Sequence, residues 1–419
     1  METVGNSEAA MDRILICILQ HRNPNYTVTA FLHLFAALRD DDELRRKCKI
    51  LLACTSRRSP ELLALERIFG SECDVEVFET IGSYPEKLRS VVNKYPPEQY
   101  QFFVKHDEDI LVSRNTWHSF LRSAPAALGD PSNLAATVNL STGIPSWMDF
   151  ADRFLHPDER DSLQSMLNHE RVPERLWGMN FEMVSRYVAR RKGAWDESAY
   201  WRFMNAQGAY SKGVHPVRIY LAYGQLLNEA ILRRYADFQT AAVSDRFTRV
   251  TDRYLCNSFF MIRYPTYTSF MNEDMLHDAK DGYGEVAMNR YREIHDLAFC
   301  FLQGSLGVHI LYNTTYMQLT QGPRRINGLR YEYECLTRYL ALVRQWLAER
   351  GETRAHQIPL AEPTPRERRA MRNWHVVFPA ALYVLSGVKR QFRNALIGLW
   401  KDTWPILSAT RSRIVSCDR

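Results

Sequence analysis

The chain has 419 residues, of which 46% are hydrophobic and 24% are charged. These proportions exclude a disordered, collagen-like or low-complexity protein, and the length allows one large domain or two ordinary ones. The formal net charge is +6, but residues 363–419 alone hold 11 Lys and Arg against 3 Asp and Glu, which leaves −2 for the rest. A basic terminus on a slightly acidic body predicts contact with a membrane surface or a polyanion there, and argues against a nucleic-acid partner.

The eight cysteines form no C-x-x-C pair and show no metal-ligand spacing, so we expect reduced thiols. The apolar run from Ile14 to Leu19 is too short for a signal-peptide core or a membrane span, and no other stretch reaches about 18 apolar residues. These features predict a cytosolic location. Together with the basic terminus, they also allow the protein to bind peripherally to the inner face of the membrane.

The first 150 residues alternate short apolar runs with helical patterns. The predicted strands span 14–20, 47–56, 73–82, 99–112 and 133–141, and the intervening helices begin near residues 23, 59 and 85. Parallel strands joined by crossover helices produce this alternation. The pattern predicts an open α/β sheet of the nucleotide-binding kind.

The remainder of the chain is less regular. Residues 146–205 show no strand pattern and predict a helical insertion, and a weak strand signal returns at 214–224. A long helix is expected at 225–247, followed by apolar runs at 257–276 and 304–316. Amphipathic helices are expected near 327–350, 364–386 and 387–402. The last two are cationic and bear Trp, which is typical of an interfacial membrane segment, although helices packed on the domain or on a second subunit fit equally well.

The acidic cluster at the end of the fourth strand is the sharpest chemical feature. In FFVKHDEDI, Asp107 and Asp109 are two residues apart in an extended segment, so their side chains can project to one side. In an open α/β sheet, ligands bind at the carboxyl ends of the strands, and a hard divalent cation that bridges phosphates is held by such carboxylates. A solvated turn is the structural alternative.

An α/β start followed by an apolar strand that ends in D-x-D resembles glycosyltransferases of the GT-A fold. The resemblance implies a mixed Rossmann-related sheet with helices on both faces, and Mn²⁺ or Mg²⁺ held by Asp109 on the diphosphate of a nucleotide sugar. Asp107 would contact the ribose or sugar, or share the metal. The match is limited to motifs over roughly residues 12–320.

The resemblance extends to two motifs further along the chain. Asn272-Glu273-Asp274 matches the x-E-D pattern of many inverting members, which implies Asp274 as general base and Glu273 beside it in the acceptor pocket. His309 lies 35 residues after Asp274, where the family often supplies a further metal ligand, and an imidazole ligand would favour manganese. A capped helix start and a buried core histidine are the respective alternatives.

The resemblance also implies donor-site residues at the carboxyl ends of the first three strands and on the helix before the fourth. These candidates are Gln20, His21, Arg22, Arg57, Glu79 and Lys87. Arg57 and Lys87 could equally be surface charges. His215 and Arg218 could bind the acceptor or a phosphate, although a buried turn at His215-Pro216 is as plausible.

The implied organisation has four parts. Residues 12–145 form the nucleotide-sugar half, 146–212 the helical insertion, 213–325 the acceptor-side half and 326–419 the basic C-terminal helices.

The implied function is transfer of a sugar from a nucleotide-sugar donor to a hydroxyl of a glycan or lipid-linked acceptor, as in polysaccharide biosynthesis. The x-E-D match favours inversion but does not fix the stereochemistry. A nucleotidyltransferase of related fold and a non-catalytic module that binds anionic membrane or polysaccharide are the alternatives.

Overall fold

The computed structural model describes residues 13–54, 59–82, 84–141, 153–161, 221–251, 255, 257–272, 285–310, 318–319, 326–365 and 367–368. The chain forms two compact units, Met1–Thr364 and Pro365–Arg419, and the fold described below is that of the first. Within the described residues, no helix combines the length and the apolar character needed to cross a bilayer.

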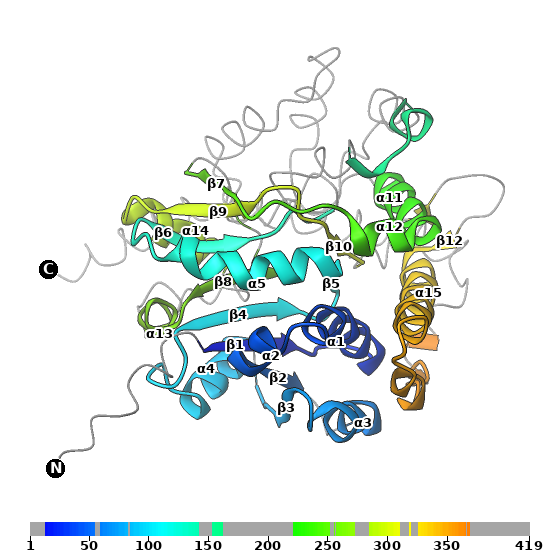
Figure 1. Ribbon diagram of the computed structural model, residues 1–419, viewed down its shortest axis with the longest axis horizontal. Coiled ribbons are helices and arrows are strands. Elements are labelled where there is room, and N and C mark those ends of the chain that lie inside the picture. Colours follow the sequence, from blue (N-terminus) through cyan, green and yellow to red (C-terminus); the bar gives the residue numbers. More distant parts are fainter. Residues whose placement is uncertain are drawn as a thin grey trace, which may run out of the picture. The chain divides into compact units, whose positions relative to one another are not determined.

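The amino-terminal half of the first unit alternates strands and helices (Figure 1). Its elements are β1 (Ile14–Leu19), α1 (Pro24–Leu38), α2 (Asp42–Lys47), β2 (Cys48–Cys54), α3 (Pro60–Phe69), β3 (Asp74–Glu79), α4 (Tyr84–Lys94), β4 (Phe102–Asp107), β5 (Ile110–Val112), α5 (Arg114–Leu128) and β6 (Asn133–Thr137). The predicted β-α-β-α-β-α-β order is therefore confirmed, with α2 as an added short helix.

The later part of the first unit contributes further strands and helices. They are α11 (Leu221–Arg233), α12 (Tyr235–Thr240), β7 (Phe247–Val250), β8 (Phe259–Arg263), α13 (Tyr264–Asn272), α14 (Glu285–Ile294), β9 (Ala298–Leu302), β10 (Gly307–His309), β11 (Gln318–Leu319), β12 (Ile326–Asn327), α15 (Gly328–Ala348) and the 3-10 helix η3 (Arg354–Gln357). Helix α15 thus belongs to the first unit, although the sequence grouped it with the C-terminal helices.

The main sheet has eight strands in the order β3-β2-β1-β4-β8-β6-β9-β7. Strands β3, β2, β1 and β4 are parallel, β8 runs antiparallel between β4 and β6, and β7 is an antiparallel edge strand. The chain starts at β1, moves outward to β2 and β3, and returns to β4 on the other side of β1. The carboxyl ends of β1 and β4 therefore flank a topological switch point, where open α/β sheets bind ligands.

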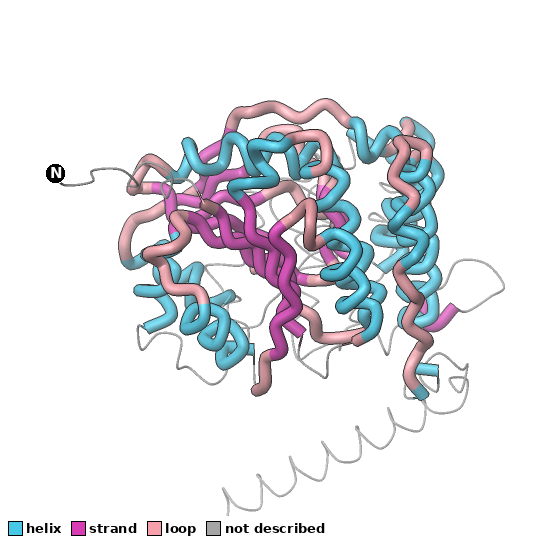
Figure 2. The backbone as a smooth tube through the Cα atoms, turned by 60° about the horizontal axis from the view of Figure 1, so that its bottom comes forward, coloured by secondary structure: helices cyan, strands magenta, loops and turns pink. Residues whose placement is uncertain are grey.

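Helices cover both faces of this sheet; Figure 2 shows them on the two sides of the strand layer. Strand β1 is buried on both sides, because Ile14, Ile16 and Ile18 pack in one core while Leu15, Cys17 and Leu19 pack in the other. The first core includes side chains of α1, α3, α5 and α15, and the second includes those of α4, α13 and α14. Burial on both faces explains why β1, β2 and β4 begin as nearly continuous apolar runs.

Three sequence predictions need correction. The strand predicted at 99–112 is two strands, β4 and β5, separated by a turn at Glu108 and Asp109. The prediction joined them because apolar residues continue on both sides of the turn. The helix predicted at 225–247 is two helices, α11 and α12, the second of which ends at Thr240. Phe247, the last residue of the predicted helix, is the first residue of β7. The weak strand signal at 214–224 is wrong for residues 221–224, which begin α11; residues 214–220 lie outside the described residues.

Candidate functional site

Two turns meet at the switch point between β1 and β4. Leu19, the last residue of β1, pairs with Asp107, so the residues that follow β1 lie beside the acidic turn. Gln20 is buried there, and its side chain donates to the carbonyl of Arg22 at 3.0 Å. The structure therefore brings together Gln20, His21 and Arg22 with the acidic cluster.

Asp109 lies against His309. The Nε2 atom of His309 is 3.4 Å from Oδ2 of Asp109, and both side chains are nearly buried. The other oxygen of Asp109, Oδ1, is buried without a hydrogen-bond partner among the described residues. Burial alone would raise the pKa of Asp109, but the neighbouring charges of His309, Arg22 and Lys105 outweigh it and hold that pKa below its usual value.

A second, small sheet brings His309 to this position. Strands β5 and β10 are antiparallel, and His309 pairs with Ile110. The N–H of Ile310 donates to the carbonyl of Asp109 at 2.9 Å, and the N–H of His309 donates to Oγ of Ser141 at 3.1 Å. Main-chain pairing thus places two residues, 200 positions apart in the chain, side by side.

Asp107 is held by a buried lysine. Its carboxylate lies 2.6 Å from Nζ of Lys105, which precedes it by two residues on β4 and is 1% exposed. Lys105 also donates to the carbonyl of Asn257 ahead of β8, and the N–H of Asp107 donates to the carbonyl of Ser258. Burial raises the pKa of Asp107, while the Lys105 charge opposes that rise.

Glu108 contacts the turn after β1, whereas Asp107 and Asp109 pair with Lys105 and His309. Its Oε1 atom accepts hydrogen bonds from the N–H groups of His21 at 2.8 Å and Arg22 at 2.7 Å. Its Oε2 atom accepts from the Thr27 hydroxyl at 3.0 Å. The side chain is 2% exposed, and burial raises the pKa of Glu108 to about 8.

Basic and neutral donors surround these acids. Although part of the His21 side chain is exposed, partial desolvation, together with the charges of Lys87 and Lys105, lowers the pKa of His21 to about 4, so its ring is neutral at pH 7. Lys87, on the first turn of α4, is 8% exposed, and burial lowers its pKa while Glu108 opposes that change. No hydrogen bond or ion pair to the Lys87 ammonium group is present within the described residues, so it is available to an anionic ligand.

The turn after β1 is also held from the side opposite the acids. The guanidinium group of Arg22 pairs with Glu332 of α15 at 2.7 Å, and the Tyr26 hydroxyl donates to the same carboxylate. The Asn25 amide pairs with both main-chain groups of Ala361, at 2.9 and 3.0 Å. These contacts restrain the turn before any ligand is present.

Several predicted site residues are not part of this cluster. Glu79 is at the exposed carboxyl end of β3. Arg57, His215, Arg218, Glu273 and Asp274 lie outside the described residues, so their roles stay predictions. The x-E-D motif begins at Asn272, which is the last residue of α13.

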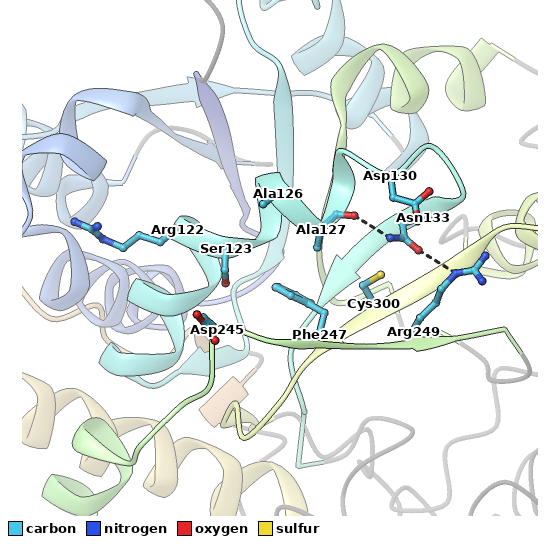
Figure 3. Close-up of a pocket in the computed structure, with 10 residues that line it drawn as sticks. All are labelled: Arg122, Ser123, Ala126, Ala127, Asp130, Asn133, Asp245, Phe247, Arg249 and Cys300. Atoms are coloured by element: carbon cyan, nitrogen blue, oxygen red, sulfur yellow. Dashed lines mark hydrogen bonds between the residues drawn. The ribbon is translucent and has the colours of Figure 1, made fainter.

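A separate open groove of about 590 Å³ lies between α5, β6, β7 and β9 (Figure 3). Asn133 crosses its floor, donating to the carbonyl of Ala127 at 2.8 Å and accepting from Nε of Arg249 at 3.3 Å. Asn133 begins β6, which runs in the same direction as β4 because both are antiparallel to β8. Phe247, which also lines the groove, pairs with Leu302 at the carboxyl end of β9, so the groove extends along the β6, β9 and β7 side of the sheet, beyond β8 from the acidic turn.

Sequence reasoning missed three residues of the cluster: Lys105, Glu108 and Glu332. The alternation of β4 could have identified Lys105, because residues 105 and 107 share one face of the strand. Glu332 could not have been found, since it is 310 residues from Arg22 and no motif links them.

Comparison with known proteins identifies no family for this chain. No family model matches the sequence, and no curated protein matches it. Among solved structures, the mannosyltransferase PcManGT from Pyrobaculum calidifontis, in complex with GDP-Man and Mn²⁺, is similar over 68% of this chain and 88% of its own, at 12% identity and a TM-score of 0.27. A similarity at that TM-score assigns neither a fold nor an activity to this chain.

Proposed function

We propose that this chain is a metal-dependent glycosyltransferase that uses a nucleotide-sugar donor. The observation that carries the proposal is the buried Asp109 carboxylate, whose Oδ1 atom has no partner among the described residues and whose Oδ2 atom is 3.4 Å from His309. It stands at the carboxyl end of β4, beside the turn after β1, where a nucleotide would lie in an open α/β sheet.

The side chains at this point fit a divalent cation that is shared with a diphosphate. The described residues contain no group of three or more His, Cys, Asp or Glu side chains arranged to hold a metal by themselves. Mg²⁺ and similar cations are often bound by one or two protein ligands, with water and substrate phosphates completing the shell. Asp109 and His309 would be those ligands, and the cation would neutralise the departing nucleoside diphosphate.

The other residues of the cluster would bind and orient the donor. Asp107 has one oxygen near Lys105 and a second that can accept a hydrogen bond from a ribose or sugar hydroxyl. Lys87 would contribute a positive charge for the phosphates, and the neutral His21 and Gln20 would line the nucleoside wall. Glu79 and Arg57 would extend this wall from the ends of β3 and β2.

The acceptor side is proposed from the sequence motifs alone. Asp274 would remove the proton from the acceptor hydroxyl if the reaction inverts, and Glu273, His215 and Arg218 would contact the acceptor. A glycan or lipid-linked acceptor suits the basic C-terminal segment, which would contact an anionic membrane surface from the cytosolic side.

The test is a thermal-shift panel of UDP, GDP, CDP, CMP and dTDP, each with and without Mn²⁺. Because a ligand that binds only the folded chain raises Tm, one nucleotide should raise it in a metal-dependent manner. Asp109→Asn should abolish the shift. Asp41→Asn is the matched control, since Asp41 is a buried carboxylate paired with Arg122 and His118 far from this site. No shift with any nucleotide would contradict the proposal and favour the non-catalytic alternative.

A further inference from the structure

The side chain of Glu108 joins two turns that are more than 80 residues apart in sequence. It belongs to the acidic turn, yet all of its hydrogen bonds described above are to the turn after β1 and to the start of α1. Its neighbours Asp107 and Asp109 have their own partners, Lys105 and His309. Glu108 is therefore placed to fix the distance between the two walls of the candidate site.

Four N–H groups near the amino end of α1 have hydrogen-bond partners within the protein. Those of His21 and Arg22 donate to Glu108, that of Asn25 donates to the Asn23 side chain, and that of Tyr26 donates to the Asn23 carbonyl. In dinucleotide-binding folds, the N–H groups of the corresponding turn and helix end hold the diphosphate. Here a carboxylate takes that position, so the turn is arranged as a rigid wall and its amides are not offered to phosphate.

We propose that Glu108 is a positioning residue that locks the His21-Arg22 turn to the acidic turn and so preorganises the donor site. With the N–H groups of the turn occupied, the diphosphate of the donor would be bound by the cation that Asp109 and His309 hold, and by Lys87. The lock itself is a property of the free chain, whereas its effect on the donor rests on the proposed function.

The restraint from α15 supports this role. Arg22 is held at its main chain by Glu108 and at its guanidinium group by Glu332, so two different elements fix one residue. A wall that is rigid before binding reduces the entropy lost when the ligand is ordered. Loss of Glu108 would free the main chain of the turn while leaving the Arg22 side chain anchored.

The lock is tested by hydrogen exchange on the full chain without ligand. In Glu108→Ala, the amides of His21 and Arg22 should exchange at least about tenfold faster than in the unaltered protein, because their buried acceptor is gone. In Glu108→Gln they should stay protected, since one amide oxygen can accept both N–H groups and the amide nitrogen can donate to Thr27. Exchange within β1 and β2 should not change.

Two outcomes would overturn the lock. One is unchanged exchange at His21 and Arg22 in Glu108→Ala; the other is faster exchange spread through β1 and β2, which would make Glu108 a general core residue. If Glu108→Ala does not fold, Glu108→Asp replaces it, because a carboxylate shortened by one methylene cannot reach both amides and Thr27 together.

The effect on the donor is measured separately, with Mn²⁺ and whichever nucleotide of the panel binds. Glu108→Ala should weaken that binding about tenfold or more, while Glu108→Gln should stay within about threefold. Equal weakening by both variants would show that the turn held in place by Glu108→Gln is not sufficient for binding, and would overturn the positioning role. Absence of any nucleotide binding would contradict the proposed function, while the exchange result would still decide the lock.

Discussion

Asp107, Glu108 and Asp109 are consecutive carboxylates in three different environments. Asp107 faces an ammonium group, Glu108 faces two amide N–H groups and a hydroxyl, and Asp109 faces an imidazole. Burial raises the pKa of Asp107 and Glu108, whereas the charges around Asp109 lower its pKa. Asp109 is thus the one of the three that we propose as a cation ligand, whereas Asp107 and Glu108 are held by partners within the protein.

The pair formed by Lys105 and Asp107 gives a prediction at this scale. Lys105→Met should destabilise the fold by about 3 kcal/mol, because removing one partner of a buried pair leaves the other charge uncompensated. Adding Asp107→Asn should recover part of the loss, since the remaining side chain is then neutral. Urea unfolding of the two single variants and the double variant measures this coupling, and strictly additive losses would show that the pair does not act as a unit.

At the scale of elements, the predictions succeeded where burial is continuous and failed where turns interrupt apolar runs. Strands β1, β2 and β4 were predictable because both of their faces are buried, and the edge strand β3 because its buried Val75 and Val77 alternate with more exposed residues. The split between β4 and β5 was not, because Ile110 to Val112 continue the apolar pattern beyond the turn. Helix α5 gave no prediction, since Pro125 lies inside it and polar residues dilute its apolar face.

The approach of His309 to Asp109 was implied only by family resemblance. In the structure it depends on the pairing of β10 with β5 and on contacts to residues 139–141. Spacing in the sequence cannot specify such a pairing, because the strands are short and nearly 200 residues apart. The contacts of Glu332 and Ala361 with the turn after β1 were unpredictable for the same reason.

Gly307 gives a prediction for β10. A Cβ atom there would lie 2.7 Å from Leu140 Cδ2 and 3.4 Å from the carbonyl of Asn139, so alanine requires the Leu140 side chain to repack or β10 to shift. Gly307→Ala should destabilise the fold by about 1 to 3 kcal/mol and weaken Mn²⁺-dependent nucleotide binding by displacing His309. Gly129→Ala is a control at a helix end remote from the site, although its Cβ also has one close contact, the Ala126 carbonyl at 3.1 Å. Unchanged binding in a destabilised Gly307→Ala would contradict the role given to β10.

For the first unit as a whole, buried neutral histidines predict loss of stability in acid. Burial lowers the pKa of His33 to about 3 and that of His106 to about 4, against 6.5 in the unfolded chain. Between these values the unfolded state binds protons that the folded state does not, so the free energy of unfolding falls as pH drops below 6.5. Above pH 6.5 both states are neutral and these residues add no pH dependence.

Urea unfolding at pH 7 and pH 5 measures this effect. Each histidine should contribute about 2 kcal/mol of the loss. His33→Asn should remove about 2 kcal/mol of this pH-dependent loss. It should also lower stability at both pH values, because His33 contacts Tyr235 and Gln239. The same pH dependence in His33→Asn as in the unaltered protein would show that His33 is not the source.

The proposed function requires Asp109 and His309 to hold a divalent cation on a nucleotide diphosphate at the switch point of the sheet. The most direct measurement is electron paramagnetic resonance of Mn²⁺ titrated into the full chain with the nucleotide selected by the thermal-shift panel. The signal of free Mn²⁺ should decrease with one site per chain, and Asp109→Asn and His309→Ala should each restore it, whereas Asp41→Asn should not. Full binding of Mn²⁺ and nucleotide by Asp109→Asn would contradict the account.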